Sequence, residues 1–277
     1  MPSFLRAILA TDNRDLANGL KQLVSYCEGQ GVKIALVGAL APAVLISGPI
    51  KGITHLGGRE TRDVDSVVEL QSWAEWGTFT AGLIQLGFQK DRDEHRLRYG
   101  DAQFDLIPYG GLVTADQVLT WPSSKLEMHM IGMSDALNNA KLTKVLSDVS
   151  LPVAPLWSII VLKVAAYRDR QYPRDLSDIV YIADEFEKSE PQTRRYDVIG
   201  EANGVTFEHA GAYLLGSDIK AYGSAESVAY SKEFFKSIQD EYSTIIAIVL
   251  REENRAFSDS RRTYVYKLFK AVHLGLQ

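Results

Sequence analysis

The 277-residue sequence predicts an α/β (α+β) fold in which a small mixed sheet flanked by helices precedes a helical C-terminal half. Short apolar runs closed by glycine or proline recur in the first 115 or so residues. They alternate with helical patterns in the order α-β-α-β-α-β-β, and from about residue 205 the pattern is helical to the end. We therefore expect two domains, at residues 1–150 and 151–277.

The N-terminal elements follow from the spacing of apolar residues. Leu16, Leu20, Leu23 and Val24 are spaced for one buried helix face. Further helices are expected at 39–47 and 72–88, and strands at 33–38, 63–70, 94–100 and 102–108. The first helix is expected at 12–28.

The second half is predicted to be mainly helical. A further strand is expected at 140–147, followed by helices at 156–170 and 174–188, with Asp175 placed to cap the second of these. The last segment has a basic face formed by Arg261, Arg262, Lys267 and Lys270.

Composition and charge exclude several classes of protein. Hydrophobic residues make up 46% and charged residues 23%, which is ordinary globular composition. The net charge of −5 excludes the overall basic field of non-specific nucleic-acid binders. Cys27 is the only cysteine, which fits a reducing compartment. With no signal-peptide layout and no long apolar segment, we expect a soluble cytoplasmic protein with no membrane contact.

Asp63 and Asp65 open one predicted strand, two residues apart. Side chains alternate in a strand, so both carboxylates face the same way and repel each other unless a cation lies between them. Mg²⁺ suits hard oxygen ligands of this kind. The competing interpretation is a solvated strand end beside Arg59 and Arg62.

Asp105 and Gly38 add to this pattern. Asp105 lies between Phe104 and Leu106 in an apolar strand, where an ionised group needs a partner. If the two strands are neighbours, three carboxylates converge; otherwise Asp105 faces water from an edge strand. Gly38 ends a strand before a helix, where glycine either makes a tight turn or exposes backbone N–H groups to an anion. The five histidines show no metal-binding spacing.

The order Gly38-Ala39, "TRDVDSVVEL" and "FDLIP" resembles the DNA polymerase beta-type nucleotidyltransferase superfamily. Within it, "LKVAAYRDRQYPRDLSDI" is similar to the second signature of the AbiEii-type nucleotidyltransferases, which include toxins of type IV toxin–antitoxin systems. The matching positions are Lys163, Arg170, Asp175 and Asp178. The sequence departs from the family at Ala39, where a second small turn residue is usually glycine or serine, and in a longer gap before Asp63.

The resemblance implies a magnesium-dependent transfer of a nucleoside monophosphate from an NTP to an acceptor. Asp63, Asp65 and Asp105 would bind metal, with Asp105 also acting as the base or orienting it. Lys163 would be a further catalytic residue that donates to phosphate oxygens; the alternative is a lysine that extends from an apolar helix to water. A nucleotide-binding set is implied as well: Gly38, Ala39, Arg62, Lys163, Arg170 and Asp178. Alternatively, Arg170 pairs with Asp175 or Asp178, Asp178 contacts the lysine, and Arg59 and Arg62 merely balance the carboxylates.

The implied partners are an NTP, an RNA acceptor such as a tRNA 3′ end or a protein acceptor, and a cognate antitoxin. A small-molecule acceptor of the antibiotic type remains open. Three other functions compete: a metal-dependent glycosyltransferase with an Asp-x-Asp motif, a catalytically silent binding or regulatory member, and a nucleic-acid-binding module using the basic C-terminal helix.

Overall fold

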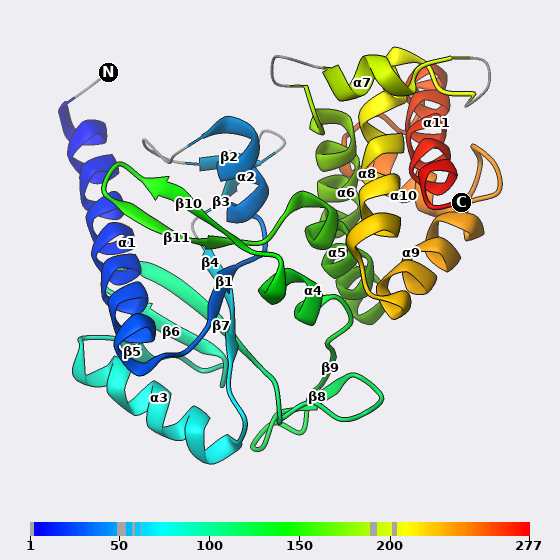
Figure 1. Ribbon diagram of the computed structural model, residues 1–277. Coiled ribbons are helices and arrows are strands. Elements are labelled where there is room, and N and C mark those ends of the chain that lie inside the picture. Colours follow the sequence, from blue (N-terminus) through cyan, green and yellow to red (C-terminus); the bar gives the residue numbers. More distant parts are fainter. Residues whose placement is uncertain (1–2, 49–53, 57–58, 62, 189–192, 201–203) are drawn as a thin grey trace. The chain divides into compact units, whose positions relative to one another are not determined.

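The computed structural model describes residues 3–48, 54–56, 59–61, 63–188, 193–200 and 204–277 (Figure 1). For residues 3–13, 54–56, 59–61 and 193, the backbone alone is considered. The chain divides into two compact units, Met1–Pro155 and Leu156–Gln277. The expected boundary between 150 and 151 falls inside strand β11 (Val149–Val153), which belongs to the sheet of the first unit.

A seven-stranded mixed sheet forms the centre of the first unit, in the order β10-β11-β1-β4-β7-β6-β5. Its other strands are β1 (Ile34–Leu36), β4 (Asp63–Glu69), β5 (Gln89–Lys90), β6 (Arg96–Tyr99), β7 (Ala102–Tyr109) and β10 (Lys141–Leu146). The neighbours β4 and β7 are parallel, whereas β1 and β6 run antiparallel to the members of that pair. The predicted mixed sheet is thereby confirmed.

Four helices accompany this sheet: α1 (Ser3–Gln30), α2 (Leu40–Ser47), α3 (Trp73–Gln85) and α4 (Met133–Asn138). The long helix α1 runs beside the sheet and contacts β6, β7 and β11 (Figure 1). Gly19 permits this approach, because a Cβ there would lie 2.5 Å from the ring of Phe104. Leu20, Leu23 and Phe104 are fully buried, so the helix–sheet contact forms the core.

The sequence did not predict two short hairpins in the first unit. One pairs β2 (Thr54–Leu56) with β3 (Arg59–Thr61), and the other pairs β8 (Val118–Thr120) with β9 (Glu127–His129). Strands β5 and β11 and helix α4 were also not predicted. Each hairpin strand has three residues, which is too short for a reliable alternation of apolar and polar positions.

The second unit is helical where the structure describes it, as predicted. It contains α5 (Leu156–Arg170), α6 (Pro173–Glu185), α7 (Thr193–Val198), a 3₁₀ turn (Phe207–His209), α8 (Ala210–Tyr222), α9 (Ala225–Ser237), α10 (Thr244–Glu252) and α11 (Asp259–Gly275). Glycines bring α8 and α11 into backbone contact, since a Cβ on Gly216 would lie 2.1 Å from the carbonyl oxygen of Val272. None of the helices described is both long and apolar enough to cross a membrane.

The prediction that Asp175 caps α6 is wrong. The helix begins at Pro173 after Tyr172, and no side chain caps it. Proline fits the first helical position because its missing N–H would have no helical partner there. This start places Asp175 in the first turn, where its carboxylate points inward to two cations and is 1% exposed.

Candidate active site

Strands β4 and β7 bring the three predicted carboxylates to one place on the sheet. Asp65 is directly opposite Asp105, and Asp63 is opposite Gln103. Residues paired in a parallel register point to the same face, so Asp63, Asp65 and Asp105 share it. The expectation that the two strands are neighbours is confirmed. Strand β7 also lies between β4 and β6, so Asp105 is not on an edge strand.

The turn from β1 to α2 lies against Asp65. Gly38 has a φ of +62°, a backbone conformation that favours glycine. A Cβ on Gly38 would lie 1.9 Å from Oδ2 of Asp65, so the carboxylate occupies the space beside the glycine. The N–H of Val37 also donates to the carbonyl of Asp65 at 2.8 Å. Ala39 precedes α2 in a helical conformation without a side-chain cap. The glycine turn and the carboxylate cluster therefore form one site.

Arg96 is the cation that the structure places beside this cluster. It lies opposite Asp105 on β6, and its Nε and Nη2 donate to the two carboxylate oxygens at 2.8 and 2.9 Å. Its Nη1 lies 3.1 Å from Oδ2 of Asp93. The hydrogen bond to Asp105 raises the pKa of Arg96, so its charge is permanent. The sequence analysis did not select Arg96, although the "RLRYG" and "AQFD" hairpin places it opposite Asp105.

The electrostatics of Asp63 reflect burial and the charge of Asp105 on the neighbouring strand. Burial raises the pKa of Asp63 above its ordinary value, and the charge of Asp105 raises it further, whereas Arg96 and Arg98 lower it. Burial is therefore the main reason that the pKa of Asp63 is raised, with opposing contributions from one carboxylate and two guanidinium groups.

The donor chemistry fits a magnesium ion only in part. Asp63 and Asp65 supply hard oxygen ligands, and one or two carboxylates with substrate phosphates are the usual magnesium ligands. Both oxygens of Asp105 are bound to Arg96. Among the residues that the structure describes, no three His, Cys, Asp or Glu side chains form a group that could hold a metal ion. The three-carboxylate metal site therefore stays a prediction.

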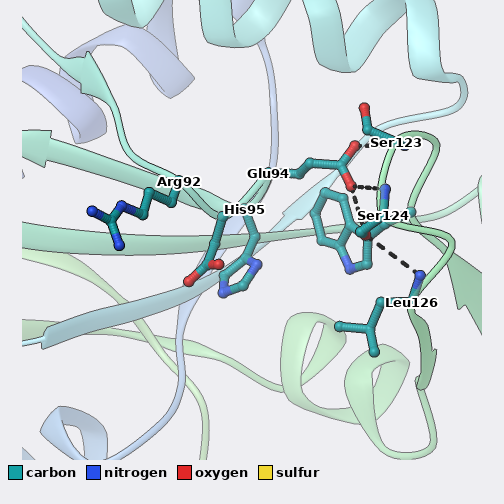
Figure 2. Close-up of a pocket in the computed structure, with 8 residues that line it drawn as sticks. Arg92, Glu94, His95, Ser123, Ser124 and Leu126 are labelled. Atoms are coloured by element: carbon teal, nitrogen blue, oxygen red, sulfur yellow. Dashed lines mark hydrogen bonds between the residues drawn. The ribbon is translucent and has the colours of Figure 1, made fainter.

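A pocket of about 350 Å³ lies next to the cluster (Figure 2). Its walls are the segment 92–95 before β6 and the β8–β9 turn, with Trp121, Ser123, Ser124 and Leu126. His95 belongs to both places, because it lines the pocket and its Nε2 lies 3.9 Å from Oδ2 of Asp105. Histidine spacing in the sequence gave no sign of this.

Hydrogen bonds and aromatic packing hold the pocket walls together. The carboxylate of Glu94 accepts from the backbone N–H of Ser123 and of Ser124 and from the Ser124 hydroxyl, at 2.9, 2.9 and 2.7 Å (Figure 2). Burial opposes ionisation of Glu94, but the hydrogen bonds from Ser124 and Ser123 lower its pKa to about 2. Trp121 is 1% exposed and packs against Trp73 and Trp76.

In the second unit, the signature residues bind one another. Lys163 Nζ lies 3.1 Å from Oδ1 of Asp175 and 2.7 Å from Oδ2 of Asp178. Arg170 donates to both oxygens of Asp175 at 2.8 Å. Burial opposes ionisation of Asp175, but Arg170 and Lys163 hold its pKa below the usual value. The alternatives in which Asp178 contacts the lysine and Arg170 pairs with Asp175 are confirmed.

The remaining basic candidates divide into two groups. Arg62 lies outside the described residues, and the side chain of Arg59 is not described either. On α11, Arg261 forms a bidentate pair with Glu253, and Arg262 pairs with Asp259. These pairs neutralise two of the four basic residues of this face, whereas the other two, Lys267 and Lys270, are exposed.

Comparisons with known proteins find likenesses among solved structures alone. No family model matches the chain, and no curated protein matches it. The solution structure of the antibiotic-resistance factor ANT(2'')-Ia is similar over 60% of this chain and 80% of that chain. The two sequences are 10% identical and the TM-score is 0.37. At these values, the likeness carries no argument about activity.

Proposed function

We propose that the protein is a magnesium-dependent nucleotidyltransferase, which moves a nucleoside monophosphate from an NTP to a hydroxyl acceptor. The observation that carries this proposal is the contact between the Gly38 turn and Asp65, on a strand paired in register with that of Asp105. A glycine turn with backbone N–H groups suits a triphosphate, and carboxylates beside it suit the metal that accompanies the triphosphate.

In the proposed reaction, the acceptor oxygen attacks the α-phosphorus of the NTP. The bond from that phosphorus to the oxygen bridging to the β-phosphorus breaks, and pyrophosphate leaves with the bond electrons. The acceptor proton passes to a base. Magnesium, when bound, would offset the charge of the triphosphate and of the leaving group.

The chain's own residues would divide these tasks. Asp63 and Asp65 hold the metal, the turn at Gly38 and Ala39 contacts the triphosphate, and Asp105 faces the acceptor. Roles for Lys163, Arg170 and Asp178 in phosphate binding rest on the resemblance alone. Lys163 already pairs with Asp175 and Asp178, so a phosphate would compete with two carboxylates for its charge.

The acceptor and the biological role are proposed from the same resemblance. We favour RNA, such as a tRNA 3′ end, or a protein hydroxyl as acceptor. On this proposal the protein is a toxin of a toxin–antitoxin or abortive-infection system with a cognate antitoxin. The alternatives are an antibiotic-type small-molecule acceptor, or a catalytically silent member that binds a partner.

The test incubates the protein with Mg²⁺, each of the four α-labelled NTPs, and separate RNA, protein and small-molecule fractions of a cell extract. The Asp63→Asn/Asp65→Asn double variant serves as control. Label in one fraction with the wild-type protein alone would support transfer and name the nucleotide and acceptor class. Label in none, together with no NTP binding, would refute the enzyme and leave the silent binding protein.

A further inference from the structure

We infer that Asp105 serves the acceptor rather than the metal, with Arg96 as its positioning residue and the pocket beside His95 as the acceptor's binding site. This inference rests on the proposed nucleotidyl transfer. It departs from the three-carboxylate metal site that the family resemblance implies, and it assigns Arg96, His95 and the pocket, which the sequence analysis left without a role.

The contacts of Asp105 argue against a metal ligand. A bidentate guanidinium–carboxylate pair is the strongest arrangement that two such side chains form, and it fixes the carboxylate plane. The side chain of Asp105 is 13% exposed, so the pair is only weakly screened by water. Arg96 is itself anchored by Asp93. A metal ion at Asp105 would have to displace a cation that already neutralises it.

The surroundings of Asp63 and Asp65 differ from those of Asp105. Asp65 lies against the glycine turn, and Asp63 shares its face of the sheet. These two side chains come from the same strand, whereas Asp105 is held from the far side by β6. The sheet thus separates a carboxylate pair facing the turn from a carboxylate tied to an arginine.

The pocket lies on the Arg96 side of Asp105. His95 directly precedes Arg96 and joins the two places, since it lines the pocket and approaches Asp105. Through His95, a hydroxyl bound in the pocket would be connected to Asp105, although Asp93 and Glu94 are the carboxylates that line the pocket itself. A volume of about 350 Å³ falls within the range of small-ligand sites, and the bonded walls form it in advance.

The lining selects the ligand's chemistry. Leu126 and Trp121 contribute apolar surface, while His95, Ser123 and Ser124 offer hydrogen-bonding groups. Charged groups of both signs complete the lining: Arg92, Asp93 and Glu94. A compact group with a hydroxyl and an apolar side fits this mixture. A terminal nucleoside of RNA, a protein side chain or a whole small molecule could supply it, and the three extract fractions distinguish these sources.

Metal titration tests the assignment of Asp105 without relying on turnover. Mn²⁺ binding in the presence of a non-hydrolysable NTP analogue would be followed by electron paramagnetic resonance for four proteins: wild type, Asp65→Asn, Asp105→Asn and Glu69→Gln. Glu69 is a matched control, being a carboxylate on β4 that pairs with Lys33 at 3.1 Å. We expect Asp65→Asn to weaken Mn²⁺ binding by about tenfold or more, and the other two variants to change it less than about twofold.

Each outcome decides a different claim. If Asp105→Asn weakens Mn²⁺ binding as much as Asp65→Asn does, Asp105 is a metal ligand and the inference is wrong, although the transferase stands. If the wild-type protein binds no Mn²⁺ with any NTP analogue, both the proposed function and the inference fail. Circular dichroism spectra of the variants verify that each has folded.

Kinetics test Arg96 and the pocket. Arg96→Lys keeps the positive charge but removes the planar guanidinium group that holds both oxygens of Asp105. We therefore expect a lower kcat, with unchanged Mn²⁺ affinity and unchanged KM for the NTP. Leu126→Trp fills the pocket rim, and Leu142→Trp is its control because Leu142 is 75% exposed on β10. The half-saturating amount of the accepting fraction should rise for Leu126→Trp alone. Equal values for the two leucine variants would overturn the pocket assignment.

Discussion

Replacement of Lys163 by methionine should destabilise the helical unit strongly. Lys163 is 12% exposed and lies between Asp175 and Asp178, whose side chains are 1% and 4% exposed. At an effective dielectric constant of 20, unit charges at 2.7 and 3.1 Å attract by about 6 and about 5 kcal/mol. The desolvation of all three groups offsets much of this, but methionine leaves the carboxylates buried with less compensating charge.

The expected net loss is about 3–5 kcal/mol in the free energy of unfolding, the usual result of removing one partner from a buried ion pair. This corresponds to a fall in Tm of roughly 10 °C or more. The measurement is urea and thermal unfolding followed by circular dichroism at 222 nm, which reports on the helices of both units.

Lys188→Met is the matched control. Lys188 also approaches two carboxylates, Asp184 at 3.1 Å and Glu185 at 2.8 Å, but it is 37% exposed. Exposed pairs contribute below about 1 kcal/mol, so this variant should unfold close to the wild type. If Lys163→Met loses no more stability than Lys188→Met, the buried network does not stabilise α5 and α6, and the reasoning from burial is wrong.

Four further predictions concern the first unit. Asp63→Asn should stabilise the protein at neutral pH. The pKa of Asp63 is higher in the folded than in the unfolded protein, so the wild type loses stability as the pH rises from the ordinary pKa of aspartate to the folded pKa. Asparagine does not ionise and removes this loss. A dependence of Tm on pH that is the same in both proteins would contradict the prediction. The pKa of Glu94 is lowered from 4.5 to about 2, so its ionised carboxylate stabilises the pocket walls fully at pH values above 4.5. This stabilisation is lost as the pH falls from about 4.5 to about 2. The protection of the Ser123 and Ser124 amides from hydrogen exchange, relative to their intrinsic exchange rates, should therefore fall in acid, and Glu94→Gln should show the same loss at neutral pH. Burial, followed by the charge of Glu28, raises the pKa of Cys27 to about 12, so its thiol should react with a disulfide reagent at pH 8 only after unfolding. Gly38→Ala should cost about 1–2 kcal/mol from the positive φ alone and should weaken NTP binding by displacing Asp65, which equilibrium dialysis would measure.

The sequence predicted the parts of the site that depend on local pattern. Alternation along "TRDVDSVVEL" and "AQFDLIP" located both strands, and an aspartate inside an apolar run predicted that Asp105 needs a partner. That partner was expected to be metal, whereas the structure supplies Arg96. An arginine in a partly exposed strand has no distinctive pattern, and only the hairpin register places it opposite Asp105.

Long-range pairing also explains the error at Asp175. An aspartate near a predicted helix start is typical of a cap, and local sequence cannot tell a cap from a buried ion pair. Lys163, twelve positions earlier on α5, and Arg170 draw the carboxylate inward. With Pro173 as the first helical residue, the N-cap position falls on Tyr172, three residues before Asp175. His95 was missed for a similar reason, since its importance comes from its contacts with the pocket and with Asp105.

The central claim concerns the bond that breaks in the NTP, and pyrophosphate release tests it most directly. Wild-type protein would be incubated with Mg²⁺, the NTP and the accepting fraction, while pyrophosphate and transferred α-label are counted together. The account predicts one pyrophosphate for each label transferred, and neither product with Asp63→Asn/Asp65→Asn. Release of inorganic phosphate or nucleoside diphosphate in place of pyrophosphate would contradict nucleotidyl transfer.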